Sequence, residues 1–177
     1  MVRIIVNRGF TLIELMVVVA LVAVFALIGI PSYRNITTTN RMATELNAFV
    51  GDLQFARSEA IKRGQFVTMC ASATGAACLG ANTTNWTPGW IVFTDPNNND
   101  TVDAGESVLR IQQALQQGDS LAATVSGAIT FNRNGFLSGV NNQTISLNDS
   151  SGTVQRRSCV VISKVGRVRL DSGANCP

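Results

Sequence analysis

The sequence contains no histidine, and only 14% of its 177 residues are charged. Histidine is the commonest general base and the commonest metal ligand in proteins, so its absence removes the usual starting point for both kinds of site. A nucleophile elbow and a phosphate-binding glycine loop are also lacking. We therefore expect neither enzyme activity nor a cofactor. We expect instead a function in assembly or binding.

Charge is also too scarce for a general polycation. The net charge is +3, and Arg3 and Arg8 are two of the 14 basic residues. Without residues 1–9, 12 basic side chains would face 11 acidic ones. Any affinity for nucleic acid must therefore come from a local cluster.

The sequence has no Cys-x-x-Cys motif and no zinc-ribbon spacing. Its four cysteines are Cys70, Cys78, Cys159 and Cys176. Four cysteines allow three pairings, and the local one would close two short loops and pin the C-terminal tail. Four unpaired buried thiols are the alternative. Disulfides would place this part of the chain in an oxidising compartment, the bacterial periplasm or beyond.

What is abundant is apolar sequence near the start. From Phe10 to Ile30 the only ionisable residue is Glu14. A helix of this length spans about 31 Å, close to the hydrocarbon thickness of a bilayer. A removable signal peptide would have a shorter apolar region and a small-residue cleavage site. The run predicts a transmembrane helix over residues 10–30.

The charges around this run predict its orientation. Arg3 and Arg8 precede it, and basic residues favour the cytoplasmic side. We expect a single pass through the inner membrane, with the N-terminus in the cytoplasm and everything after Pro31 exported.

Glu14 is out of place in such a helix. A carboxylate costs on the order of 2.5–3.5 kcal/mol at the bilayer centre and less near the surface. That cost suggests a partner of opposite charge. The nearest candidate is the α-amino group that a cut between Gly9 and Phe10 would create.

The stretch RGFTLIELMVVVA, from Arg8 to Ala20, resembles the class III signal of type IV pilins and type II secretion pseudopilins. The resemblance implies that a prepilin peptidase removes the leader, residues 1–9, by cutting after Gly9. It also implies that Phe10 is then N-methylated and that Glu14 neutralises the new amine of a neighbouring subunit. Pro31 matches the proline that commonly kinks the pilin helix.

After Pro31 the apolar residues recur every three or four positions. The stripe consists of Met42, Leu46, Phe49, Leu53, Ala56 and Ala60. This spacing predicts one apolar helix face that packs on the globular domain. We expect an amphipathic half-helix over residues 31–64, with helix from Phe10 to Arg63 and Gly64 as its terminator.

Residues 65–177 show a period of two, which is typical of strands. The predicted strands are Phe66–Cys70, Trp90–Thr94, Ser107–Ile111, Ala128–Asn132, Thr144–Asn148, Ser158–Ser163 and Arg167–Leu170. Asn134-Gly135 predicts a hairpin. The expected fold class is α+β, a long N-terminal helix packed on one or two antiparallel sheets.

Two stretches narrow the family. LQFARSEAIKRG with VTMC, followed by GWIVFTDPNNNDTVDAGESVLR, resembles the GspH/FimT/FimU branch of minor pilins and minor pseudopilins. The resemblance implies a low-abundance subunit of the pilus initiation and tip complex, with other minor and major pilins or pseudopilins as partners. The alternative is the H-type minor pseudopilin of a type II secretion system. The stretch GRVRL favours the pilus.

The loop after Trp90–Thr94 has oxygen-bearing side chains at the spacing of an EF-hand. They are Asp95, Asn97, Asn99, Asp103 and Glu106. This spacing suggests calcium binding. Position 6 is Asp100 rather than glycine, and the flanks read as strands, so a polar turn is the alternative.

The C-terminal stretch is locally basic. Arg167 and Arg169 would lie on one face of the last strand, with Lys164 just before it. Paired guanidinium groups suit successive phosphates. Gly166-Arg167-Val168-Arg169 also matches the Gly-Arg-x-Arg motif by which FimT-like minor pilins bind DNA in natural transformation. The alternative is a solvated strand face.

Overall fold

The structure, a computed structural model, describes residues 9–80, 82–116, 118–139 and 142–176. Its contacts divide the chain into two compact units, one ending at Thr39 and one beginning at Asn40. Helix α1 (Leu12–Arg63) contributes to both units. It begins two residues later than predicted and ends at the predicted position. Gly64 terminates it with φ +67°, and the Gly64 N–H donates to the Ala60 carbonyl (3.0 Å).

The first half of α1 exposes its apolar side chains. An 18-residue window within the helix has a mean hydropathy of 2.9, and none of that window is buried. By length and composition this helix can cross a membrane. The backbone remains helical through position 31, whose side chain lies outside the described part of the structure. The predicted kink there is therefore untested.

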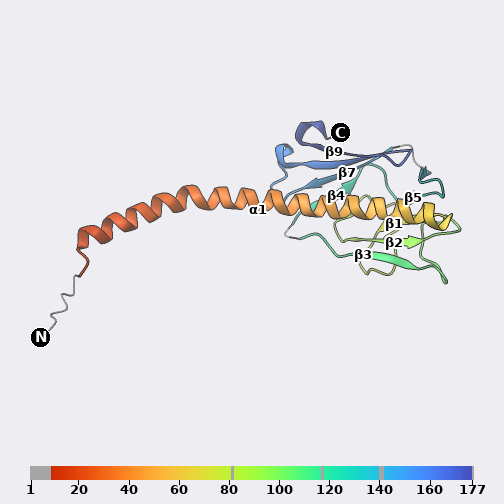
Figure 1. The fold of residues 1–177 in the computed structure, drawn as a ribbon, viewed down its shortest axis with the longest axis horizontal. Coiled ribbons are helices and arrows are strands. Elements are labelled where there is room, and N and C mark those ends of the chain that lie inside the picture. Colours follow the sequence, from red (N-terminus) through yellow and green to blue (C-terminus); the bar gives the residue numbers. More distant parts are fainter. Residues whose placement is uncertain (1–8, 81, 117, 140–141, 177) are drawn as a thin grey trace, which may run out of the picture. The chain divides into compact units, whose positions relative to one another are not determined.

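The second unit contains two antiparallel sheets. The five-stranded sheet has the order β3-β2-β1-β5-β6, and the four-stranded sheet has the order β4-β7-β8-β9. Figure 1 shows β4, β7 and β9 along one side of the second half of α1 and β1, β2 and β3 along the other. The bounds are β1 Val67–Ala71, β2 Trp90–Thr94, β3 Val108–Gln112, β4 Ser120–Ala123, β5 Ile129–Phe131, β6 Leu137–Ser138, β7 Asn142–Asn148, β8 Ser158–Ser163 and β9 Val168–Ser172, with 3₁₀ turns at Val154–Arg156 and Gly173–Asn175.

The core lies between the second half of α1 and both sheets. All six residues of the predicted helix stripe are buried. The ring of Phe49 meets Trp86 and Trp90 edge to face, with centroids 5.6 and 5.1 Å apart. Trp90 donates its indole N–H to Asp52 (2.9 Å), so its one polar atom is satisfied inside the core.

The predicted strands correspond to β1, β2, β3, β5, β7, β8 and β9, with bounds that match within two residues. The hairpin at Asn134-Gly135 joins β5 to β6 as expected. Strands β4 and β6 are not among the named predicted strands, because two to four residues are too few to show a period of two. Arg167, predicted inside the last strand, lies in the turn before β9.

Strands β1 and β2, in the interior of the first sheet, are covered on both faces. Every residue of both strands is buried, whereas the edge strand β3 is partly exposed. Cys70, Ile91 and Phe93 form a second small core, against which Cys78 packs. The structure joins Cys70 to Cys78 and Cys159 to Cys176, the local pairing. The first disulfide thus holds a loop over the outer face of the sheet.

Candidate functional site

The predicted cleavage point lies in the non-helical segment before α1. Gly9 and Phe10 are both exposed, and the helix starts only at Leu12. A peptide bond outside a helix is accessible to a peptidase. A Cβ built at Gly9 would meet no atom within 4 Å. Packing among the described residues therefore does not require a glycine there.

Glu14 caps the helix whose first turn it occupies. Its N–H donates to the Thr11 hydroxyl (3.3 Å), and its Oε2 accepts from the Thr11 N–H (3.1 Å) and hydroxyl (3.2 Å). This is a capping box, which satisfies two of the donors left over at a helix N-terminus. The positive end of the helix dipole also favours the carboxylate.

This second role of Glu14 was not predicted. Its signal was present as Thr11-x-x-Glu14 immediately before an apolar run. The capping box holds the carboxylate beside the junction with Gly9. Each carboxylate oxygen can accept more than one hydrogen bond. The Glu14 carboxylate can therefore also accept a hydrogen bond from an amine.

The Asp95 carboxylate serves the loop that contains it. Asp95 is buried; one oxygen accepts from the Asn99 N–H (3.0 Å) and the other from the Asp100 N–H (3.1 Å) and the Thr68 hydroxyl (2.7 Å). Asp100 has φ +59°, the left-handed region that aspartate tolerates better than most residues. The carboxylate thus holds a tight turn.

The other predicted calcium ligands also bond to one another. Asp103 accepts from the side-chain amides of Asn97 (2.9 Å) and Asn99 (2.7 Å), and these bonds lower the pKa of Asp103. Glu106 accepts from the Asp103 N–H (2.9 Å). Within the described ranges, no group of three or more Asp, Glu or Cys side chains is arranged to hold a metal. This geometry favours the polar turn, and calcium binding stays an untested prediction.

Gly166, the first residue of the Gly-Arg-x-Arg motif, has a structural role. It is buried with φ +74°, and its N–H donates to the Ser163 carbonyl (2.8 Å) in the turn between β8 and β9. Its carbonyl accepts from Arg57 of α1 (2.7 Å). A Cβ at this position would collide with the Gly135 carbonyl oxygen. Glycine is therefore needed for packing, independently of any ligand.

The three predicted DNA-binding cations are all exposed but differ in their partners. Lys164 and Arg167 lie in the β8–β9 turn, and neither side chain has a carboxylate partner among the described residues. Arg169, on β9, pairs with Asp171 (2.7 Å). Val168, between Arg167 and Arg169, packs against the core, as the strand pattern predicted. Two of the three charges are thus free for a ligand.

Two protein-family models match the chain. The one described as Type II transport protein GspH covers residues 45–166, and the prokaryotic N-terminal methylation motif covers residues 6–30. The first alone spans more than half of the sequence. The chain belongs to the GspH family. The GspH model covers most of the second half of the helix, all of the first sheet and most of the second. The methylation motif covers the Gly9–Phe10 junction and Glu14.

Sequence relatives match the chain over short stretches. Prepilin peptidase-dependent protein D of Escherichia coli is 49% identical over 44 residues, 25% of this chain and 30% of the relative. A fimbrial protein of Pseudomonas aeruginosa is 37% identical over 66 residues, 37% of this chain and 42% of the relative. The matches thus span less than half of either relative's length.

Solved structures resemble the chain over most of its length. The type IV minor pilin FimU of Pseudomonas aeruginosa superposes with a TM-score of 0.57 at 22% identity, covering 82% of this chain and 96% of FimU. The minor pseudopilin EpsH of Vibrio cholerae gives 0.54 at 15% identity, covering 76% and 99%. At these low identities, the superpositions show a shared pilin fold.

Proposed function

We propose that this GspH-family chain is a leader-processed minor subunit of a type IV pilus. One observation carries the proposal. Glu14 is the only ionisable residue between Phe10 and Ile30, and the capping box holds it next to the non-helical Gly9–Phe10 junction. A carboxylate at that position would be stabilised if cleavage created a positively charged amine nearby.

The proposed mechanism follows from the charges. Cleavage after Gly9 frees the α-amino group of Phe10. When a neighbouring subunit enters the filament, that amine pairs with Glu14 in surroundings of low dielectric constant, where opposite charges attract more strongly than in water. The apolar first half of α1 then packs among the same segments of other subunits. The role is structural, as in the rest of the family.

The proposed location is the inner membrane before assembly. The basic leader would stay in the cytoplasm, and residues after position 31 would lie in the periplasm. Both disulfides suit an oxidising compartment. Fusing a periplasm-dependent reporter enzyme to the C-terminus should give activity, and fusing it to the N-terminus should give none.

Processing and assembly are tested together in the host. Intact-mass measurement should find a chain that starts at methylated Phe10. Glu14→Gln keeps the size of the side chain and removes its charge. It should therefore reduce the amount of this subunit recovered in sheared filaments at least tenfold, while cleavage after Gly9 proceeds normally. Glu106→Gln is the matched control and should assemble normally. An uncut chain, or normal assembly of Glu14→Gln, contradicts the proposal.

The second candidate is an H-type pseudopilin of a type II secretion system. The likeness to EpsH supports it as much as the likeness to FimU supports a pilus subunit. Deleting the gene and scoring piliation, protein secretion and transformation together separates the two. Loss of secretion with normal piliation would replace our first proposal by the second.

DNA contact during natural transformation would be an added role of a pilus subunit. The exposed and carboxylate-free Lys164 and Arg167 support it, while the pairing of Arg169 with Asp171 weakens it. If DNA binds, changing Arg167 to alanine should weaken binding equally for all sequences and flatten its salt dependence. Arg169→Ala should have the smaller effect. Absence of a gel shift by the unaltered chain at low salt refutes DNA contact.

A further inference from the structure

Two turns from different sheets meet at the C-terminal end of α1. The first joins β5 to β6 and contains Gly135, and the second joins β8 to β9 and contains Gly166. A Cβ built at Gly135 would lie 2.8 Å from Ile61 Cδ1, and one built at Gly166 would lie 3.0 Å from Arg57 Nε. The Leu137 N–H also donates to the Lys164 carbonyl (2.8 Å). The turns are thus packed together on the helix.

Three apolar side chains remain exposed at this junction. Ile61 on α1 is 51% exposed, Phe136 in the first turn 43% and Val165 in the second turn 54%. Phe136 belongs to an ordered turn, since its N–H donates to the Asn132 side chain (3.1 Å). Its exposure therefore does not come from a loose loop. We call Ile61, Phe136 and Val165, together with the cations Arg133, Lys164 and Arg167, the turn patch.

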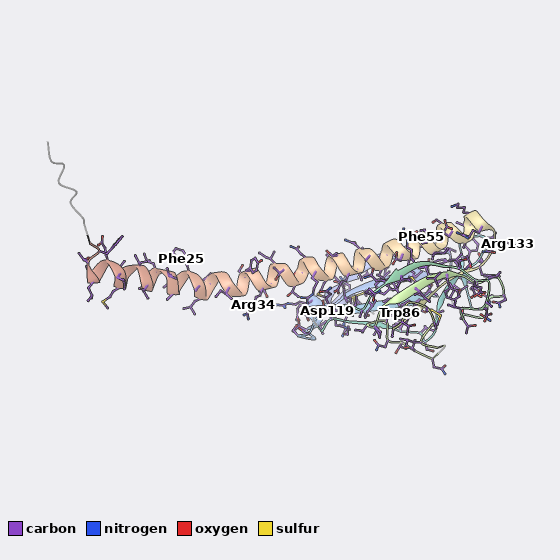
Figure 2. The ribbon with its side chains drawn as sticks, turned by 90° about the horizontal axis from the view of Figure 1, so that it is seen from below. Phe25, Arg34, Phe55, Trp86, Asp119 and Arg133 are labelled. Atoms are coloured by element: carbon purple, nitrogen blue, oxygen red, sulfur yellow. A yellow bond between two sulfur atoms is a disulfide. The ribbon has the colours of Figure 1, made fainter. Side chains whose placement is uncertain are left out.

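A cleft adjoins the patch. It has a volume of about 470 Å³ and is lined by Gly64, Phe66, Pro96 and Arg133, among others. Figure 2 shows Arg133 next to the end of α1. Arg133 therefore belongs to both the cleft and the turn patch. A protruding side chain of a partner could enter there while its neighbours cover the apolar residues.

The patch also gathers positive charge that the described part of the chain does not pair with carboxylates. Apart from Arg57, the second unit has seven other cations, of which Arg157 donates to the Asn148 side chain (3.0 Å). The other six pair with carboxylates, in the pairs Arg41–Asp119, Lys62–Glu59, Arg63–Glu59, Arg110–Asp52, Arg156–Asp149 and Arg169–Asp171. Among the described residues, Arg133, Lys164 and Arg167 have no carboxylate partner. Arg57 donates to the Gly166 carbonyl (2.7 Å) and has no carboxylate partner within the described ranges either. The surface that fits the patch must therefore carry negative charge.

We infer that the turn patch docks the globular domain of a neighbouring filament subunit, one that presents an apolar side chain flanked by carboxylates. The inference rests on the proposed filament role, which supplies such neighbours. A nucleic acid would satisfy the cations, but its phosphates offer no partner for Ile61, Phe136 and Val165. Apolar anchors inside a charged rim are instead the usual pattern of a protein–protein interface.

The test is site-specific photocrosslinking of the full chain in its host. The photoreactive analogue p-benzoyl-phenylalanine replaces Phe136, and in a matched control it replaces Val154. Val154 is similarly exposed (46%) but lies in the turn before β8, whereas Lys164, Val165 and Arg167 of the turn patch lie in the turn at the other end of that strand. The adducts are identified by mass spectrometry, with and without nuclease, and the N-terminus of the chain is read in the same samples.

We expect an adduct between position 136 and another leader-bearing subunit, at least tenfold stronger than at position 154. Changing Arg133 and Lys164 together to glutamate should reduce it at least fivefold. A nuclease-sensitive adduct, no adduct, or equal adducts at both positions overturns the inference. If the chain still starts at Phe10 and enters filaments, that failure leaves the proposed function standing. If the chain retains residues 1–9, both fail.

Discussion

The two halves of α1 use apolar residues in different ways. Before Thr39 the apolar side chains surround the helix and are exposed, whereas after Asn40 they form one stripe that includes the fully buried Phe49 and Leu53. An apolar surface on all sides is stable only in lipid or among similar helices. A single stripe is enough to build a core with two sheets. One continuous helix thus serves two environments.

The largest effect on folding should come from the buried stripe. Leu53→Ala removes a fully buried side chain between α1 and the sheets. We expect the free energy of unfolding to fall by about 2–5 kcal/mol, because a cavity remains. Unfolding of the full chain in detergent by denaturant, followed by tryptophan fluorescence, measures this. The matched control is Leu21→Ala in the exposed half, which should stay within about 0.5 kcal/mol of the original. Equal effects would remove the distinction between the halves.

A charge placed in the first half tests the environment of that half. Leu21→Arg should cost about 2.5–3.5 kcal/mol of membrane insertion, because arginine is poorly accommodated in hydrocarbon. The fraction that remains in membranes after alkaline carbonate extraction measures the loss. Asn47→Arg is the control, since Asn47 is exposed on the second half. If Leu21→Arg stays in the membrane as well as the control does, the first half is not a membrane segment.

The contact between the two turns and the second half of α1 can be tested at Gly166. Gly166→Ala combines a positive φ with a collision against the Gly135 carbonyl, whereas Gly152 has φ +63° and no atom within 4 Å of its built Cβ. We expect Gly166→Ala to cost about 1–3 kcal/mol more than Gly152→Ala, because only the former forces backbone to move. Denaturant unfolding of both variants gives the difference. Similar costs would mean that the contact between the turns is not tight.

The smallest effect should be a pH dependence at Glu45, on the second half of α1. Burial raises the pKa of the Glu45 carboxyl, the neighbouring Asp119 raises it further, and the Gln116 N–H and Arg41 oppose the shift. The folded chain thus binds this proton more tightly than the unfolded chain, so the contribution is present at low pH and is lost as pH rises through the raised pKa. Glu45→Gln, which does not ionise, should gain up to about 1 kcal/mol over the original between about pH 4 and pH 7. Denaturant unfolding of both proteins at about pH 4 and about pH 7 checks this. If Glu45→Gln instead loses stability relative to the original as pH rises, the direction of the pKa shift is wrong.

Periodic patterns predicted the long elements well. The stripe from Met42 to Ala60 showed the buried helix face, and Trp90–Thr94 and Ser158–Ser163 gave strand bounds that the structure reproduces. Those segments succeeded because each carries its own hydrophobic period. Strands β4 and β6 are too short for a period, and they form only because β7 and β5 offer them hydrogen-bonding edges.

The candidate sites divide in the same manner. Gly9, Phe10 and Glu14 lie within six residues, so a local motif was enough to single them out. The turn patch draws on Ile61, Phe136 and Val165, which are separated by up to about a hundred positions in the sequence. Each is an unremarkable apolar residue in its own segment.

The amino-acid sequence by itself determined the membrane-length helix, the amphipathic stripe and the family, and it predicts the leader junction, because these depend on the order and period of neighbouring residues. Tertiary structure alone decided which cations keep their charge free and which apolar side chains stay exposed together. It also decided that Gly166 must be a glycine. These properties depend on partners supplied by distant parts of the chain, and only folding brings them within contact distance.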